Sequence, residues 1–377
     1  MDVKRLSLLD VFICTVSAAL LAFYFTVWLF FAGNPAAKRS DFMIYYAAGT
    51  LPLSKLYNID AQREVQTSVM GSPFPIEGGV LPFNHTPVLV PLLHLVVDDD
   101  YAASYLRWTA LLWLAAFVSA VVVIKMTGDV ALAFATISFY PLFTYIQQGH
   151  DTVFMLLGVL LCAYMLSLQN DFLAGIALSL TALKPHFAIF IAIPLIAKPK
   201  AFLGFCIAAV SLAFYSVLLV GTKGVAEFLA ILRISAGGEG FGMRPLLMLN
   251  LLGLMERAGV SSDVARPVGW AVFVVTAILL LLVWKRNPSK PPLAVTLLLA
   301  VFTSPHLHGH DLALLVITFI TLSKPNAVLL IVSSLALLSL SISSTNWLFV
   351  FAYFLMLVLL ILSIRDIRPK GMLLDDV

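Results

Sequence analysis

Asp41 is the first acidic residue after the opening apolar segment of this chain, and two tyrosines follow it closely. A carboxylate at the edge of an apolar region can have a raised pKa and take a proton from a hydroxyl, so Asp41 is a candidate general base. The same side chain can instead cap the short interfacial helix that the following apolar residues predict. Tyr45 and Tyr46 are either substrate contacts or aromatic residues of the membrane interface.

Two short polar motifs interrupt the apolar pattern further along the chain. Asn84-His85 precedes a short apolar stretch that contains prolines. This pair can hydrogen-bond a sugar or phosphate at a helix N-terminus, or Asn84 can cap that helix. Gln148, His150 and Asp151 lie in a tight connection between two apolar segments, where they either face a cavity or solvate a turn. All five are predicted as candidate substrate contacts.

A lysine in an otherwise apolar stretch is a candidate phosphate ligand. Lys184-Pro185-His186 is such an interruption, and Pro185 cannot continue the hydrogen-bond ladder of a helix. A lysine in lipid is costly unless it faces a cavity or an anion, so Lys184 is predicted to bind phosphate and His186 to contact substrate. An interfacial lysine that extends toward water is the alternative. Arg244, in a glycine-rich stretch, is predicted as a second phosphate ligand in a gating loop, with a plain flexible linker as the alternative.

The densest group of imidazoles is His306, His308 and His310, followed by Asp311. Alternating histidines suggest a metal site, but the absence of nearby cysteines and the turn expected at Gly309 favour hydrogen bonding to a sugar or phosphate. We predict that His308 contacts substrate and that His310 binds the donor phosphate. No metal ligand and no cofactor are predicted, and a divalent metal is left open.

The composition indicates the environment of these residues. Hydrophobic residues make up 61% of 377 and charged residues 11%, whereas soluble domains carry roughly 25% charged residues. The chain is therefore predicted to be an all-α polytopic membrane protein. Its net charge of +3 gives no indication of nucleic-acid binding. Cys14, Cys162 and Cys206 lie far apart in apolar runs and are predicted to be unpaired thiols.

The apolar runs predict about 12 transmembrane helices, with 86–97 as a short re-entrant segment. Lysines and arginines flank the runs, and placing them on the cytoplasmic side puts the loops 32–101 and 221–264 on the other side. Nearly all the candidate residues above then share that non-cytoplasmic face. The acidic run 98–100 is predicted to be a solvated turn, with a divalent-cation site as the alternative. The whole chain, 1–377, is predicted to form one transmembrane domain.

Several sequence elements occur in a particular order. They are Asp41 with Tyr45 to Gly49, Leu56-Tyr57, Phe83 to Pro87 with Pro91-Leu92, Gln148-Gly149-His150, Lys184-Pro185, and Ser304-Pro305 with His308 and His310. Together they resemble glycosyltransferase family 87 over about residues 8–320. Asn84-His85 departs from the aromatic-proline pattern that is more usual in this family, which leaves the sugar and the acceptor open.

The resemblance implies a GT-C fold with short re-entrant and interfacial helices. It also implies transfer of a sugar, mannose or another hexose or pentose, from a polyprenyl-phosphate donor to a lipid or glycan acceptor. The best-known family members are polyprenol-phosphate-mannose-dependent α-mannosyltransferases. The expected location is the inner (plasma) membrane, with the active site on the periplasmic or extracytoplasmic side. By resemblance Asp41 is the base, and Lys184 and the late histidines are phosphate contacts. The predicted reaction is an inverting transfer in which Lys184, helped by Arg244 or His310, neutralises the phosphate leaving group.

A transporter or flippase of lipids or lipid-linked sugars is the competing hypothesis. Broken helices and sparse charge within the membrane occur in transporters as well. No inverted repeat is evident in the sequence, and the polar residues gather on one face instead of at mid-membrane. These two features favour the glycosyltransferase, whose expected partners are the lipid-linked donor, the acceptor and the surrounding membrane lipids.

Overall fold

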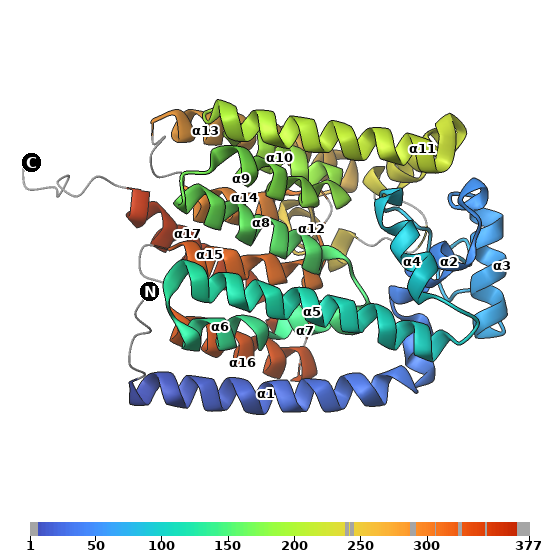
Figure 1. Cartoon of the computed structure of the whole chain (residues 1–377), viewed down its shortest axis with the longest axis horizontal. Coiled ribbons are helices and arrows are strands. Elements are labelled where there is room, and N and C mark those ends of the chain that lie inside the picture. The colour runs from blue at the N-terminus through green and yellow to red at the C-terminus, as the bar shows by residue number, and fades with distance from the viewer. Residues whose placement is uncertain are drawn as a thin grey trace, which may run out of the picture.

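The computed structural model describes residues 7–237, 241, 245–286, 292–305, 307–322, 326–343 and 345–367. Within them the regular structure is helical, with one isolated antiparallel bridge between Met248 and His308. Figure 1 shows long helices running side by side and a group of short helices at one end. The predicted fold class, an all-α polytopic membrane protein, is confirmed.

Five described helices are long and apolar enough to cross a membrane, and a bent pair of shorter helices is a sixth candidate. The five are α1 (Leu8–Ala32), α5 (Tyr101–Thr127), α11 (Pro199–Gly237), α13 (Ser262–Arg286) and α17 (Thr345–Ile367). The bent pair is α6 (Val130–Ile137) with α7 (Tyr140–Gln148), at an angle of 43°. A helix of about 25 residues extends roughly 38 Å, which exceeds the ~30 Å hydrocarbon core of a bilayer.

The remaining helices of the bundle are shorter. They are α8 (Thr152–Ser167), α9 (Asp171–Leu178) continuing into η4 (Ser179–Leu183), α10 (Pro185–Leu195), α14 (Leu293–Thr303), η6 (Gly309–Leu314) leading into α15 (Leu315–Thr321), and α16 (Ala327–Ser343). The predicted apolar runs coincide with helices. Because these shorter ones do not reach the length of a full span by themselves, the figure of about 12 crossings stays a prediction.

The short helices at one end of the bundle come mainly from the segment between α1 and α5. They are η1 (Pro35–Arg39), α2 (Phe42–Thr50), η2 (Leu53–Lys55), α3 (Ile59–Met70), η3 (Pro87–Leu89) and α4 (Val90–Val96). α4 packs against α2 in this group (Figure 1). Its seven residues extend only about 10 Å, so this part of the segment 86–97 does not cross a membrane.

The described residues of the predicted loop 221–264 are largely helical, and most of its glycine-rich segment 237–242 lies outside the described residues. α11 continues to Gly237, and only Gly221 departs from helical geometry, with φ 67° and ψ 176°. The chain then forms η5 (Pro245–Leu247) and α12 (Leu251–Arg257) before α13 begins. The physical reason is that the residues after Gly224 have apolar side chains at helical spacing, and this spacing outweighs one glycine kink.

The outer helices α1 and α11 differ from α5 in how far their side chains are buried. α1 and α11 lie along opposite edges of the bundle in Figure 1, and they expose large apolar side chains such as Phe12 and Leu218. Such outward apolar faces suit contact with lipid. α5 instead buries Tyr105 and Trp108 completely. These two aromatic residues lie near the end of α5 that adjoins the short helices, and they support the site described below.

Candidate active site

Asp41 lies at the N-terminal end of α2. It occupies the N-cap position, but its side chain makes no capping hydrogen bond. His150 Nε2 lies 3.0 Å from Asp41 Oδ2 instead, and the Asp41 side chain is 29% exposed. The predicted N-cap position of Asp41 is thus confirmed, but the predicted capping hydrogen bond of its side chain is not formed. A buried histidine holds this carboxylate at the boundary between the protein interior and solvent.

A second histidine and carboxylate lie beside this pair. The ring centroids of His85 and His150 are 6.0 Å apart, and His85 Nδ1 lies 3.0 Å from Asp151 Oδ2. The Tyr45 hydroxyl is 3.2 Å from His85 Nε2 and accepts a hydrogen bond from the backbone N–H of Asp151, also at 3.2 Å. All four side chains are buried. Five predicted site residues from three separate segments thus form one cluster, which we call the Asp41 cluster (Asp41, Tyr45, His85, His150 and Asp151).

Gly149 allows α2 to approach the turn between α7 and α8. It ends α7 with φ +81°, and a Cβ at this position would lie 2.7 Å from the Cβ of Phe42 in α2. Only glycine combines a left-handed backbone with so close a contact at low cost. The turn is also tied to α5, because Trp108 Nε1 donates to the Gly149 carbonyl at 2.7 Å and the Tyr105 hydroxyl donates to the Gln147 carbonyl at 2.8 Å.

Lys184 forms an ion pair within the protein. Its Nζ lies 2.6 Å from Asp311 Oδ1, and the Tyr145 hydroxyl donates a hydrogen bond to the same oxygen. The other Asp311 oxygen accepts from the backbone N–H of His308 at 2.9 Å. Lys184 precedes α10, with Pro185 at the first helical position, so the predicted helix break is confirmed. The ammonium group is thus charge-compensated, and an incoming phosphate would have to share it with Asp311.

Burial and neighbouring charges shift the pKa values of several residues in the site. Burial alone would raise the pKa of the Asp151 carboxyl, but His85, His150 and Lys184 bring it below its usual range. Burial and the neighbouring Asp151 raise the pKa of the Tyr45 hydroxyl well above its usual value, so this group stays protonated. Burial also lowers the pKa of His308, although Asp311 and Asp41 oppose the shift, and this favours a neutral imidazole.

The structure places three predicted substrate contacts outside the Asp41 cluster. Tyr46 follows Tyr45 in α2, but its hydroxyl donates to the Asp99 carbonyl at 3.5 Å and not to the cluster. Asn84 is partly buried before η3; Thr86 occupies the N-cap position of that helix, so the capping alternative for Asn84 is wrong. Gln148 is the last residue of α7 and is partly buried.

The remaining predicted residues are described only in part. The backbones of His186 and His310 lie in α10 and η6, next to Lys184 and Asp311 respectively, and their side chains lie outside the described part of the structure. Arg244 lies outside the described residues altogether. Their predicted contacts with phosphate and substrate stay predictions.

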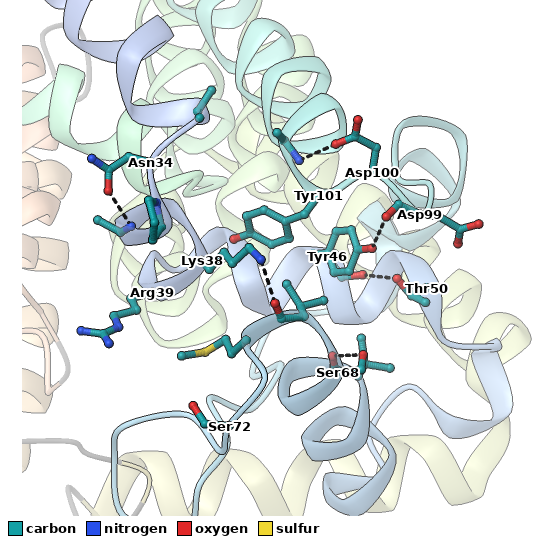
Figure 2. A pocket seen from close by; sticks show the side chains of 18 residues that line it. Asn34, Lys38, Arg39, Tyr46, Thr50, Ser68, Ser72, Asp99, Asp100 and Tyr101 are labelled. Atoms are coloured by element: carbon teal, nitrogen blue, oxygen red, sulfur yellow. Dashed lines mark hydrogen bonds between the residues drawn. The ribbon is translucent and has the colours of Figure 1, made fainter.

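A large cavity is lined in part by Tyr46 and Thr50 of α2, as Figure 2 shows. Its volume is about 1340 Å³. Its labelled polar lining residues are Asn34, Lys38, Arg39, Tyr46, Thr50, Ser68, Ser72, Asp99, Asp100 and Tyr101. Lys38 Nζ donates to the Val69 carbonyl at 2.9 Å across this space. Asp41 is not among the lining residues, so Tyr45 and Tyr46 belong to two different polar regions.

The acidic run 98–100 has a structural role at the edge of this cavity. Asp100 caps α5 by accepting from the backbone N–H groups of Ala102 and Ala103. Asp98 pairs with Arg107, and this pairing lowers the pKa of its carboxyl. The predicted solvated turn is confirmed, and Asp98 and Asp100 take part in ion pairing and helix capping.

Sequence reasoning assigned no role to Asp311 or Tyr145. Asp311 is almost fully buried and pairs with Lys184, so it determines how much positive charge Lys184 can offer to a ligand. One signal was available: Asp311 directly follows the histidine cluster and is the only acidic residue of a long apolar region. Tyr145 lies inside an apolar run and carried no comparable signal.

Within the described residues, His85, His150 and Asp151 form a group with the geometry to hold a metal ion. One ligand atom from each lies within 4.8 Å of the other two, and all three side chains are buried. The predicted metal-like motif, His306 to His310, is a different segment. The chemistry available at this end of the bundle therefore comprises a partly exposed carboxylate, a paired ammonium group and a group of buried imidazoles.

Comparison with known proteins gives the class of enzyme. The sequence model of glycosyltransferase family 87 matches residues 83–307, which is more than half of the chain. The chain belongs to glycosyltransferase family 87. No curated protein and no solved structure matches this family 87 glycosyltransferase.

The residues that the family model matches include only part of the site of this family 87 enzyme. His85, His150, Asp151 and Lys184 lie inside the matched range, whereas Asp41 and Asp311 lie outside it. The structure nevertheless pairs Asp41 with His150 and Asp311 with Lys184. Both carboxylates thus belong to the polar region that the matched residues form, and the apolar helices identify the protein as a membrane enzyme.

Proposed function

We propose that this enzyme transfers a sugar, mannose or another hexose or pentose, from a polyprenyl-phosphate donor to a hydroxyl group of a lipid or glycan acceptor. The transfer takes place at the non-cytoplasmic face of the plasma membrane, and Asp41 is the general base. The observation that carries the proposal is the position of Asp41: its carboxylate is partly exposed, does not cap its helix, and is held by His150 at 3.0 Å.

The reaction is a single displacement with inversion. Asp41 takes the proton of the acceptor hydroxyl while the acceptor oxygen forms a bond to the anomeric carbon. The bond between that carbon and the phosphate oxygen breaks, and polyprenyl phosphate leaves with the electron pair. The Asp41 side chain is 29% exposed, so an acceptor hydroxyl can approach its carboxylate and deliver the proton. A single carboxylate is sufficient, since the phosphate leaving group needs no protonation.

Lys184 is suited to receive the developing charge on the phosphate. The Lys184 side chain is 14% exposed and lies at the start of α10, where the free backbone N–H groups also favour an anion. Asp311 neutralises Lys184 in the structure described here. Partial transfer of Lys184 from Asp311 to the leaving phosphate would make its stabilisation greatest as the bond breaks, which is what electrostatic catalysis requires.

A lipid-linked donor fits the architecture. The site lies at the end of a bundle whose outer helices expose apolar side chains. A polyprenyl chain can lie against such faces while its phosphate reaches the polar end of the bundle. This arrangement also explains why a glycosyltransferase is built largely from membrane helices.

The test is sugar transfer by the purified full chain in detergent, with a polyprenyl-phosphate sugar and a lipid acceptor. Asp41→Asn keeps the shape of the side chain and removes its basicity. We expect this variant to lose on the order of 100-fold or more of kcat, because general bases contribute about 10² to 10⁴. The matched control is Asp60→Asn, which alters an exposed carboxylate paired with Arg63 on α3.

Two results would contradict the proposal. One is turnover of Asp41→Asn within about twofold of wild type while its melting temperature is unchanged. The other is transfer from a nucleotide sugar with no transfer from the polyprenyl-phosphate sugar. The first result removes Asp41 as the base, and the second removes the donor class.

A further inference from the structure

The Asp41 cluster contains more buried imidazole and carboxylate groups than a single general base requires. Asp151 is completely buried, and a buried carboxylate is costly unless a cation or several hydrogen bonds compensate it. His85 approaches Asp151 Oδ2 at 3.0 Å, while Oδ1 of Asp151 accepts no hydrogen bond from any described residue. One carboxylate oxygen deep in the site thus has unused capacity to bind a ligand.

We propose that His85, His150 and Asp151 bind a divalent cation of the zinc class. Their ligand atoms already lie within 4.8 Å of one another. A tetrahedral zinc ion with ligands at about 2.0–2.2 Å places those ligands roughly 3.3–3.6 Å apart. Side-chain rotations of modest size therefore bring the three groups onto one ion. The inference does not depend on which donor or acceptor the enzyme uses.

The type of donor atom selects the metal. Two imidazoles and one carboxylate are typical of zinc and of neighbouring transition metals, whereas magnesium and calcium prefer sites made of oxygen ligands. Three protein ligands also leave one coordination position open, as in catalytic zinc sites. His85 lies just before η3, in the segment between α1 and α5. His150 and Asp151 lie in the turn that joins α7 to α8, so the ion would connect these two parts of the chain.

Asp41 takes a specific position around this ion. A histidine that binds a metal through one ring nitrogen commonly donates from the other to a carboxylate, which fixes the ring orientation. His150 Nε2 lies 3.0 Å from Asp41 Oδ2, so Nδ1 is the ligand atom in this arrangement. Asp41 would then orient His150, and the ion would in turn hold His150 against Asp41. Tyr45, whose hydroxyl lies 3.2 Å from His85 Nε2, supports the second imidazole in the same way.

The test measures metal content and needs no assay of sugar transfer. The full chain is purified in detergent, stripped with a chelator, incubated with Zn²⁺, passed through a desalting column and analysed by inductively coupled plasma mass spectrometry. We expect about one zinc per wild-type chain. Asp151→Asn, which is close to isosteric, and His85→Ala should each lower this content at least several-fold. Substitution by Co²⁺ should give the visible absorption of a four-coordinate site in the wild type but not in these two variants.

The matched control is His94→Asn. His94 also lies in the first loop and contacts a backbone carbonyl, that of Leu51, at 3.1 Å, and it should retain the wild-type zinc content. Size-exclusion chromatography checks that each variant is folded. If a cluster variant fails to fold, the wild type still decides the inference through its zinc content and through a rise in melting temperature with Zn²⁺ but not with Mg²⁺.

Two outcomes would overturn the inference. One is a wild-type content below about one zinc in ten chains after loading. The other is a folded Asp151→Asn variant that retains the full wild-type content. Either outcome leaves the Asp41→Asn transfer assay unaffected, so failure of the metal site and failure of the proposed function can be distinguished.

Discussion

At the scale of single residues, three pairings define the polar end of the molecule: Asp41 with His150, His85 with Asp151, and Lys184 with Asp311. The sequence indicated most of these side chains because polar residues are rare in an apolar chain and each must have a partner or a function. It could not indicate which pairs form. The partners are far apart in the chain, and long-range pairing follows from tertiary packing, not from local spacing.

The ion pair between Lys184 and Asp311 supports a prediction about stability. Asp311→Asn keeps the shape of the side chain but leaves the Lys184 charge uncompensated in a mostly buried position. We expect the free energy of unfolding to fall by about 3 kcal/mol, which is the usual effect of removing one partner of a buried pair. The measurement is unfolding in detergent, by denaturant or heat.

Asp60→Asn is the control for this effect, because it breaks a pair that is mostly exposed on α3. Its expected effect is about 0.5 kcal/mol or less. Equal losses in the two variants would show that the Lys184 charge is well solvated, and that Asp311 does not restrain it. Lys184→Met combined with Asp311→Leu should recover part of the loss, since it removes both charges.

At the scale of elements, most helices were predictable and their ends were not. Hydrophobic runs and helical periodicity are local properties, so most helices of the bundle coincide with apolar segments of the sequence, whereas α3 is largely polar. In the stretch 221–264 most of the glycine-rich segment 237–242 lies outside the described residues, whereas upstream only Gly221 breaks the helical geometry of α11. Glycine content alone does not show whether a backbone departs from a helix, because packing against neighbouring helices decides this.

Gly149 gives a test of how α2 is positioned. Gly149→Ala would place a Cβ 2.7 Å from the Cβ of Phe42, on a backbone with φ +81°. We expect α2 to be displaced together with Asp41, so that kcat falls at least about tenfold and the melting temperature drops. Transfer assays and thermal unfolding of the purified variant measure the two effects.

Gly71→Ala separates backbone strain from displacement of α2. Gly71 has a similar φ of +74° at the end of α3, but a Cβ there would meet no atom within 4 Å. This variant should lose only about 1 kcal/mol of stability and keep its activity. If Gly149→Ala and Gly71→Ala behave alike, the contact between Gly149 and Phe42 does not position Asp41.

At the scale of the whole molecule, the two ends of the bundle differ in character. The short helices and the Asp41 cluster lie at one end, whereas α1 begins and α17 ends at the other (Figure 1). Exposed basic residues also lie at helix ends. Among them are Lys125 near the C-terminal end of α5, Lys200 near the N-terminal end of α11 and Arg365 near the C-terminal end of α17. The excess of lysine and arginine in cytoplasmic loops then predicts that the Asp41 cluster faces away from the cytoplasm.

Labelling of introduced cysteines tests this orientation. Cys14, Cys162 and Cys206 are free thiols, as predicted, and are first replaced by alanine to remove the background. Ser72→Cys then places an exposed thiol beyond α3, and Lys125→Cys places one near the far end of α5, which is 27 residues and therefore about 40 Å long. In intact cells a membrane-impermeant maleimide should label Ser72→Cys and not Lys125→Cys, and permeabilisation should expose both. The opposite pattern would place the Asp41 cluster on the cytoplasmic side, where nucleotide sugars are available, and would contradict the proposed lipid-linked donor as well as the proposed sidedness.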